Sequence, residues 1–266
     1  MKQRAIVMGA SSGIGREVAE RLIKAGWQVG VAARRESALE TIAAPDGKPP
    51  VVARIDARQG DAGLRLRALI ERMGGVELYF HAAGVGWQNP GLEEDKEMDT
   101  VATNAAGFTR MVGEAFRWMA DHGGGHIAVI SSVAGTKGLG AAPGYSATKA
   151  YQNTYIQALE QLSRSRRLGI MLTDLRPGFV DTALIAGSRF PMTMAPGQVA
   201  DKMVRALGRR RRVCVIDWRW RIVVAAWRLL PACLWRRMPL GGAAERGYGA
   251  KRPAGRPRGP QARCVK

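Results

Sequence analysis

The chain alternates short apolar segments with longer segments of helical periodicity. The apolar segments predict strands at residues 5–9, 28–34, 50–56, 77–84, 126–132 and 169–178, with a last strand at 213–216. Because these segments are apolar without alternation, both faces of the sheet are expected to be buried, which is typical of parallel strands covered by helices. The segments between them have helical patterns, as at 15–26, where Val18, Leu22 and Ile23 share one face. The alternation predicts an α/β fold with a doubly wound parallel sheet.

One domain is expected over residues 1–216, because neither a repeat nor a change in composition interrupts this pattern before residue 208. With 266 residues, 46% of them hydrophobic, the chain can bury a substantial core. The formal charge of +19 is uneven, since residues 208–266 hold 16 basic and 2 acidic side chains. Most of the net positive charge therefore lies in a basic C-terminal extension. In it, residues 217–240 are rich in Trp and Arg, and residues 241–266 are expected to form a disordered tail.

The cysteine pattern favours a reducing, cytoplasmic location. Cys214, Cys233 and Cys264 are far apart and form no C-x-x-C spacing, so neither a disulfide framework nor a zinc site is indicated. The sequence enters a predicted strand almost at once, without a leader pattern. No run reaches the roughly 18 uninterrupted apolar residues of a membrane-spanning helix. We therefore predict no metal site and no export.

A glycine-rich turn, "MGASSGIG" (8–15), joins the first predicted strand to the first helix and contains Gly9, Gly13 and Gly15. Glycine allows a tight turn and a close backbone approach to a pyrophosphate, which binds the free N–H groups at a helix N-terminus. A plain turn is the alternative. The strand–turn–helix context favours a dinucleotide loop.

The second strand ends at Arg34 and Arg35, where NAD-binding proteins commonly carry an acidic residue. A guanidinium pairs with a ribose 2′-phosphate that an acid would repel, so NADP(H) is preferred over NAD(H). Two solvated arginines are the alternative, and Glu36 could still reach a ribose.

Tyr145 and Lys149, in "GYSATKA" (144–150), are four residues apart near the start of a helix expected over about 144–168. Side chains at this spacing share a helix face, and a nearby ammonium lowers the pKa of a phenol toward the range useful for acid–base catalysis. The pair alone is also common on ordinary helix surfaces. Ser131 and Ser132 end the fifth predicted strand, at the edge where ligands bind in open α/β sheets.

Several spaced motifs together resemble the short-chain dehydrogenase/reductase superfamily over about residues 3–207. "MGASSGIG" is similar to the family's T-G-x-x-x-G-I-G, and "HAAG" (81–84) to its N-N-A-G. Asn104 in "TNAAG" matches a mid-helix asparagine. Ser132, 13 residues before Tyr145, precedes the Tyr–Lys pair as in the family's active site. "RPGFVDT" (176–182) resembles the P-G-x-x-x-T segment after the sixth strand.

The resemblance implies a Rossmann fold and a catalytic set of Asn104, Ser132, Tyr145 and Lys149. Tyr145 would exchange the proton of the substrate oxygen, and Ser132 would hydrogen-bond that oxygen. Lys149 would bind the nicotinamide ribose and lower the pKa of Tyr145, while Asn104 would hold a water linking Lys149 to solvent. The implied cofactor-binding residues are Gly9, Ser11, Ser12, Gly13, Ile14, Gly15, Arg34, Arg35, Asp56, Ala83, Gly84, Tyr145, Lys149, Pro177, Gly178, Val180 and Thr182. Among these, Asp56 would contact the adenine, and Thr182 would lie near the carboxamide.

Two positions depart from the family pattern. Met8 replaces the usual threonine, and His81 with Ala82 replaces the asparagine pair. Both positions brace central strands in the family, so we expect altered local hydrogen bonding and retained activity. His81 is expected to brace its strand, with a catalytic base as the alternative.

The substrate is expected to be a hydrophobic ketone or aldehyde. The segments that set specificity in this family, 85–90, 134–144 and 183–198, contain no basic cluster and supply an apolar lining. The lining residues are Trp87, Leu139, Leu184, Ile185, Phe190, Met192 and Met194. Ordinary loop packing is the alternative interpretation of these side chains.

The segment 217–240 places four tryptophans among five arginines, a composition suited to the headgroup layer of a membrane. Two interpretations are left open: association with the inner face of a membrane, or an oligomer contact or lid over the substrate pocket. The tail after Gly241 has little aromatic content, so specific nucleic-acid binding is not expected.

These features together predict an NADP(H)-dependent oxidoreductase that interconverts a carbonyl and an alcohol on an apolar or lipid-like substrate. An NAD-linked dehydrogenase of the same fold, or a nucleotide sensor without turnover, are the alternatives.

Overall fold

The computed structural model describes residues 3–42, 49–182, 184 and 190–238. In these ranges a seven-stranded parallel sheet has the order β3-β2-β1-β4-β5-β6-β7. The strands are β1 (Arg4–Met8), β2 (Gln28–Ala33), β3 (Val51–Arg54), β4 (Leu78–His81), β5 (Gly125–Ile130), β6 (Ile170–Arg176) and β7 (Val213–Val215). The order reverses between β1 and β4, so the doubly wound fold that the sequence predicts is confirmed.

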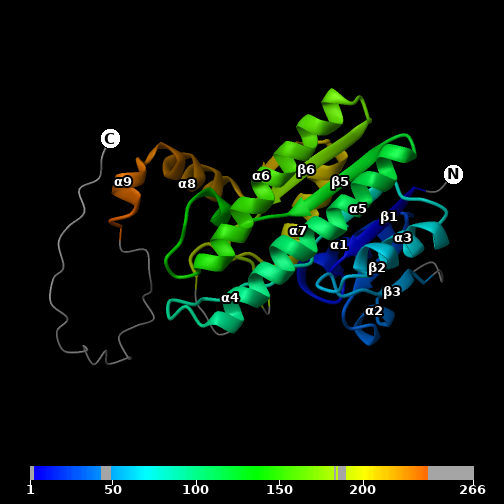
Figure 1. Ribbon diagram of the computed structural model, residues 1–266, viewed down its shortest axis with the longest axis horizontal. Helices are drawn as coiled ribbons and strands as arrows, with labels where there is room; N and C mark the ends of the chain where they lie inside the picture. Colours follow the sequence, from blue (N-terminus) through cyan, green and yellow to red (C-terminus); the bar gives the residue numbers. More distant parts are fainter. Residues whose placement is uncertain (1–2, 43–48, 183, 185–189, 239–266) are drawn as a thin grey trace.

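Helices cover both faces of the sheet (Figure 1). They are α1 (Gly13–Lys24), α2 (Ser37–Glu40), α3 (Ala62–Arg72), α4 (Glu94–Val101), α5 (Phe108–Asp121), α6 (Pro143–Ser165) and α7 (Pro196–Gly208). A π-helical turn, η1 (Ala102–Gly107), joins α4 to α5, and a short 3₁₀ helix, η2 (Val133–Thr136), follows β5. After β7 the chain forms α8 (Trp218–Leu229) and α9 (Ala232–Trp235).

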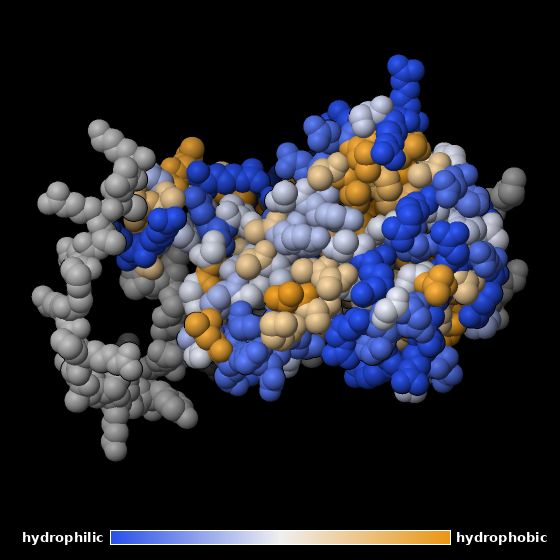
Figure 2. Space-filling model, viewed as in Figure 1, coloured by the Kyte–Doolittle hydropathy of each residue, from blue (hydrophilic) through white to orange (hydrophobic). Residues whose placement is uncertain are grey.

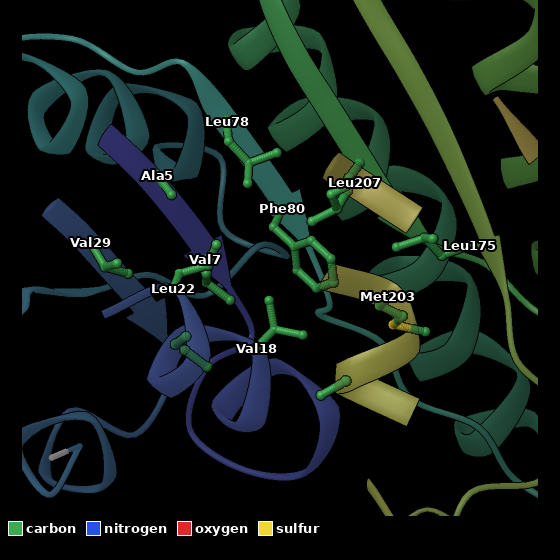
Figure 3. Packing of buried hydrophobic residues seen from close by; sticks show 14 of the residues in the cluster. Ala5, Val7, Val18, Leu22, Val29, Leu78, Phe80, Leu175, Met203 and Leu207 are labelled. Carbon is green, nitrogen blue, oxygen red and sulfur yellow. The ribbon is translucent and has the colours of Figure 1, made fainter. Parts of the chain in front are cut away.

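Two hydrophobic clusters lie on opposite faces of the sheet. Helices α1 and α7 cover one face, where Val18 and Met203 pack toward Phe80 of the central strand β4 (Figure 3). Helices α3, α5 and α6 cover the other, with Leu66, Met111 and Ile156 in one buried cluster. Burial on both faces explains why the strand sequences are apolar without alternation.

The predicted strands extend further than the observed ones at their carboxyl ends. Gly9, Arg34, Ala82, Ser131 and Pro177 all lie just outside the sheet. The strands end at these positions because turn glycines and polar side chains form the site there. The apolar residues before them stay hydrogen-bonded to the neighbouring strands. Polar and turn residues at a strand end thus mark the functional edge of the sheet.

The Trp/Arg-rich segment is helical and packs on the domain. Trp220 and Val224 of α8 are buried in a small cluster with Val133 of η2. Beyond α8, the Trp235 indole donates to the Gly138 carbonyl at 2.7 Å, and Lys137 Nζ donates to the Leu230 carbonyl at 3.0 Å. Figure 1 shows α8 and α9 at the end of the molecule opposite the N-terminus. The tail predicted at 241–266 lies outside the described residues.

Candidate active site

The predicted site residues meet at the carboxyl edge of the central strands. A Cβ atom added to Gly84, after β4, would lie 3.2 Å from Asn104 Oδ1 and 3.7 Å from Lys149 Nζ. One added to Gly13 would lie 3.3 Å from the methyl group of Thr182, after β6. The fold therefore brings together the glycine-rich turn, the end of β4, the start of α6 and the segment after β6.

Ser132 is held in place by the short helix that it caps. Its Oγ accepts a hydrogen bond from the Ala134 N–H at 3.1 Å and lies 3.5 Å from the Pro177 carbonyl oxygen. The side chain is buried. The hydroxyl is therefore fixed at the end of β5, as a group that positions a substrate oxygen requires.

Tyr145 lies in the first turn of α6, which begins at Pro143. A proline suits this position because it lacks the N–H that would be unsatisfied there. The phenol ring packs on Gly86, where an added Cβ would approach Cδ2 of the ring to 2.6 Å. Burial raises the pKa of Tyr145, and its hydrogen bond with Ser132 acts in the opposite direction. The phenol is therefore protonated at neutral pH and suited to donate a proton.

Lys149 lies one helical turn after Tyr145, and its Nζ is 5.7 Å from the centroid of the phenol ring. The ammonium donates to the Ile130 carbonyl at 3.1 Å and to Gln152 Oε1 at 3.0 Å. Burial lowers the pKa of Lys149 to about 8, and the charge of Asp174 opposes that shift. The expected lowering of the Tyr145 pKa is wrong in this structure, because burial of the phenol dominates and the ammonium is hydrogen-bonded elsewhere.

Asn104 lies in the π-helical turn η1 and is completely buried. Its side chain pairs with the backbone of Val85: Oδ1 accepts from the N–H at 2.9 Å, and Nδ2 donates to the carbonyl at 2.7 Å. Its own backbone carbonyl accepts from Gln152 Nε2 at 2.9 Å. The Gln152 amide therefore connects Lys149 to the backbone of Asn104, and the water that the resemblance places between Lys149 and solvent stays a prediction.

Gln152 is the site residue that sequence reasoning missed. It is completely buried and bridges Lys149 to Asn104. A signal was present, because Gln152 lies seven residues after Tyr145 and three after Lys149, and such positions share one helix face.

The glycine-rich turn fits a dinucleotide. Gly9 has a φ of 90°, and a Cβ there would lie 2.5 Å from the Ala83 nitrogen; a Cβ at Gly15 would lie 2.3 Å from the Gly9 oxygen. Ser12, the N-cap of α1, makes no side-chain capping bond, and the first turn carries no acidic residue. The positive N-terminus of α1 thus remains available to a pyrophosphate, flanked by Ser11 and anchored through Ile14, which packs on the core.

Arg34 and Arg35 are exposed directly after β2. Neither takes part in an ion pair among the residues that the structure describes. Asp56, after β3, is in an ion pair with Arg58 at 2.6 Å; this pair holds the pKa of Asp56 below its usual range, and the charge of Arg34 adds to the effect. The Asp56 carboxylate expected to contact adenine is therefore already bound by Arg58.

The segment after β6 is fixed by backbone contacts. The Pro177 carbonyl accepts from the Val133 N–H at 3.1 Å, and Val180 forms a β-bridge with Met194. Thr182 is thereby held beside Gly13. The structure thus places Thr182 beside the glycine-rich turn, whereas Pro177 contacts η2 and Val180 pairs with Met194.

Comparison with known proteins identifies the family to which this chain belongs. A family model described as short chain dehydrogenase matches residues 3–190. The chain belongs to the short-chain dehydrogenase/reductase superfamily. An uncharacterized oxidoreductase of Myxococcus xanthus is 34% identical over 194 residues, which cover 71% of this chain and 76% of the relative.

Two further relatives carry more specific names. A putative ketoacyl reductase of Streptomyces coelicolor is 34% identical over 196 residues, covering 70% of this chain and 73% of the relative. A crystal structure of an actinorhodin polyketide ketoreductase variant with NADPH is similar with a TM-score of 0.68 and 29% identity, covering 77% of this chain and 90% of that one. This short-chain dehydrogenase/reductase is an oxidoreductase of the type that acts on CH–OH groups.

In this short-chain dehydrogenase/reductase, His81 is buried at the end of β4. Its Nδ1 is 2.9 Å from the Tyr79 hydroxyl, and its ring packs edge-on against Phe108. Burial, with the nearby Lys149 charge, lowers the pKa of His81 to about 3, so the imidazole is neutral. Met8 pairs with His81 across the sheet and is buried. A neutral, buried imidazole supports the bracing interpretation.

Trp220 adds a wall to the site from outside the family model, which ends at residue 190. A Cβ on Gly178 would approach Trp220 Nε1 to 2.1 Å, so the indole lies directly on this glycine. The indole also packs edge-on against Phe179, which stacks on Phe190. The sequence left open that this segment covers the substrate pocket, and the contact of Trp220 with Gly178 agrees with that interpretation, but the sequence did not single out Trp220.

The remaining apolar residues divide between packing and exposure. Met192 packs on the cluster of Trp220, and Met194 is buried, whereas Trp87 and Leu184 are about half exposed. Ile185 lies outside the described residues. Within the described ranges, no group of three or more His, Cys, Asp or Glu residues is arranged to hold a metal ion. None of the described helices combines the length and apolar character needed to span a bilayer.

Proposed function

We propose that this protein is an NADP(H)-dependent carbonyl reductase that acts on a hydrophobic ketone or aldehyde. The observation that carries the proposal is the arrangement of Ser132, Tyr145 and Lys149 at the carboxyl edge of the sheet, beside a glycine-rich turn that fits a dinucleotide. The raised pKa of Tyr145 keeps the phenol protonated at neutral pH, which is the form that carbonyl reduction requires.

The proposed division of labour follows from these positions. The cofactor, when bound, supplies the hydride that adds to the carbonyl carbon. The Tyr145 hydroxyl donates its proton to the carbonyl oxygen, and the Ser132 hydroxyl donates a hydrogen bond to the same oxygen. Lys149, held by Gln152, supplies the positive charge beside the phenol and would bind the ribose hydroxyls of the cofactor. Electrostatic stabilisation of the developing alkoxide by these preorganised donors lowers the barrier.

Preference for NADP(H) is supported by Arg34 and Arg35. Both guanidinium groups are exposed at the end of β2, and neither forms an ion pair with a described acidic side chain, although Asp56 lies near enough for the charge of Arg34 to lower its pKa. A 2′-phosphate would meet two cations there, and Arg forms bidentate hydrogen bonds with phosphate. Glu36 is also exposed at this strand end, so NAD(H) is the competitor to be tested.

An apolar substrate is supported by the side chains around Trp220. Phe179, Met192 and Trp227 pack around the indole, and Phe190 stacks on Phe179. Val133, the residue after Ser132, lies in the same cluster, and Gly178 contacts the indole directly. Ketoacyl and polyketide ketoreductase relatives, which are named for ketone substrates, agree with this class. The cytoplasmic location and the homo-oligomer remain predictions.

The decisive experiment is to screen NADPH oxidation against hydrophobic ketones and aldehydes, with NADH in parallel. Turnover should be faster with NADPH, and Tyr145→Phe should lower kcat by about 10²- to 10⁴-fold, the usual contribution of a positioned acid. Near wild-type turnover in Tyr145→Phe would disprove the mechanism. Tight NADPH binding without turnover of any substrate would favour a nucleotide sensor.

A further inference from the structure

Helix α8 has two apolar faces, and only the inner one has a partner in the described structure. Trp220 and Val224 are 4% and 3% exposed and pack on the domain. Trp235 is also buried, and Trp227 stacks edge-on between these two indoles. Three of the four tryptophans that suggested a membrane anchor are therefore committed to the fold. Trp218 is the exception.

The outer face carries an exposed apolar stripe. Trp218, Ile222 and Leu229 are 62%, 61% and 84% exposed. At 100° per residue, positions 218, 222 and 229 lie within about 40° of one line along the helix, so these side chains form one stripe. We call these three residues the outer stripe. Beyond Pro231, Leu234 and Met238 are exposed as well.

Arginines border the outer stripe. Arg221 and Arg228 lie on one side of it, and both are exposed. Arg236 and Arg237 follow α9 and are also exposed, and none of these four is in an ion pair with a described residue. Residues 218–238 contain no acidic side chain. In Figure 2, hydrophobic and hydrophilic surfaces lie next to each other at the end of the molecule that carries α8 and α9.

We propose that the outer stripe of α8 docks the protein on an anionic membrane surface. Apolar side chains in one line, bordered by long basic side chains, match a helix that lies in the headgroup layer, with the stripe among the acyl chains and the guanidinium groups on lipid phosphates.

Charge favours a membrane as the partner of the outer stripe over a second copy of the chain or the residues after Met238. A second copy that paired its own α8 here would bring two unpaired arginine sets together. The sequence after Met238 holds seven basic residues and one acidic residue, so it too would be repelled from the stripe. An anionic lipid surface is the partner whose charge is complementary.

The docked orientation has a consequence that rests on the proposed function. The inner face of the same helix contacts Gly178 and the segment after Ser132. Docking would therefore place the catalytic edge of the sheet next to the bilayer, where an apolar carbonyl compound partitions. The docking itself does not depend on any particular reaction, so its failure would leave the reductase proposal untouched.

The test is co-sedimentation of the full chain with vesicles of phosphatidylcholine alone or mixed with phosphatidylglycerol. We expect binding to the mixed vesicles, weakened by salt. The double variant Ile222→Glu/Leu229→Glu should bind at least about tenfold more weakly, because each buried aliphatic side chain contributes a factor of this order. Arg221→Gln/Arg228→Gln should weaken binding to the mixed vesicles by about tenfold or more.

The matched control is Leu64→Glu/Met98→Glu, which puts the same two charges at side chains of α3 and α4 that are 72% and 58% exposed and far from α8 in sequence. It should bind like the wild type, and all variants should keep the wild-type melting temperature. Equal binding to neutral vesicles, or binding that survives the double variant, would overturn the proposal. Absence of vesicle binding together with a dimer that the double variant dissociates would assign the stripe to a second copy instead.

Discussion

Gln152 Oε1 accepts a hydrogen bond from Lys149 Nζ at 3.0 Å, while its Nε2 donates to the Asn104 carbonyl at 2.9 Å. One neutral amide thus fixes the Lys149 ammonium against a helix that is distant in sequence. Because both its polar atoms are used, the orientation of Gln152 is determined, and so is the position of Lys149.

The Gln152 bridge predicts a shift in the pH profile. Gln152→Leu removes an acceptor from a buried ammonium, so the pKa of Lys149 should fall below about 8, and the basic limb of the reduction profile should move to lower pH. Gln152→Glu should move it the opposite way, because a carboxylate favours the charged lysine. Gln157→Leu, at an exposed position of α6, is the control and should leave the profile unchanged. A loss of rate in Gln152→Leu without a shifted limb would indicate a merely structural role.

The two reaction directions should respond to pH in opposite ways. Reduction needs a protonated Tyr145, whose pKa is raised, and a charged Lys149, whose pKa is about 8. We therefore expect kcat/KM for reduction to be flat through neutral pH and to fall above about pH 8. Alcohol oxidation needs the phenolate, so its rate should rise with pH. Initial rates measured in both directions check this, and an oxidation rate already maximal at neutral pH would contradict it.

Gly86 should be required for the position of the catalytic phenol. In Gly86→Ala the new methyl carbon would lie 2.6 Å from the Tyr145 ring, so the ring must move. A displacement of about 1 Å in a reacting group can cost about 10²-fold in rate, and we expect kcat to fall by that order. Gly91→Ala, where no atom lies within 4 Å of the added Cβ, is the matched control. NADPH binding, measured by fluorescence titration, should change little in either variant.

Arg34 and Arg35 should set the choice between the two cofactors. Charge-assisted hydrogen bonds contribute about 1.5–3 kcal/mol, so Arg34→Ala should raise the KM for NADPH by roughly 10- to 100-fold and leave that for NADH nearly unchanged. Arg35→Ala is expected to act in the same direction. Arg72→Ala, an arginine at the end of α3, serves as the charge control. A parallel loss with both cofactors would show that Arg34 contacts a part that they share.

The sheet could be predicted from sequence because both its faces are buried, and that requirement leaves apolar strands without alternation. The glycine-rich turn and the Tyr145–Lys149 pair could also be predicted from the sequence, since each depends on local geometry. The raised pKa of Tyr145 could not be predicted, because it depends on how completely other segments bury the phenol. The Gln152 bridge could not be predicted either, because the sequence does not show that η1 places the Asn104 carbonyl within hydrogen-bonding distance of α6.

The outcome was similar for the C-terminal segment. Its composition indicated an amphipathic helix, but tryptophan and arginine occur on both sides of α8, so periodicity alone did not separate the faces. The separation comes from tertiary contacts, chiefly that of Trp220 with Gly178.

The contact of Trp220 with Gly178 also determines when, during synthesis, the site can be completed. The glycine-rich turn, Ser132, Tyr145 and Gly178 all leave the ribosome before α8 does, and domains fold as synthesis proceeds. A nascent chain that ends before Trp220 would carry every predicted catalytic group but lack one wall of its site. Completion of the site thus requires translation of Trp220, which lies 38 residues after Thr182, the last of the predicted cofactor-binding residues.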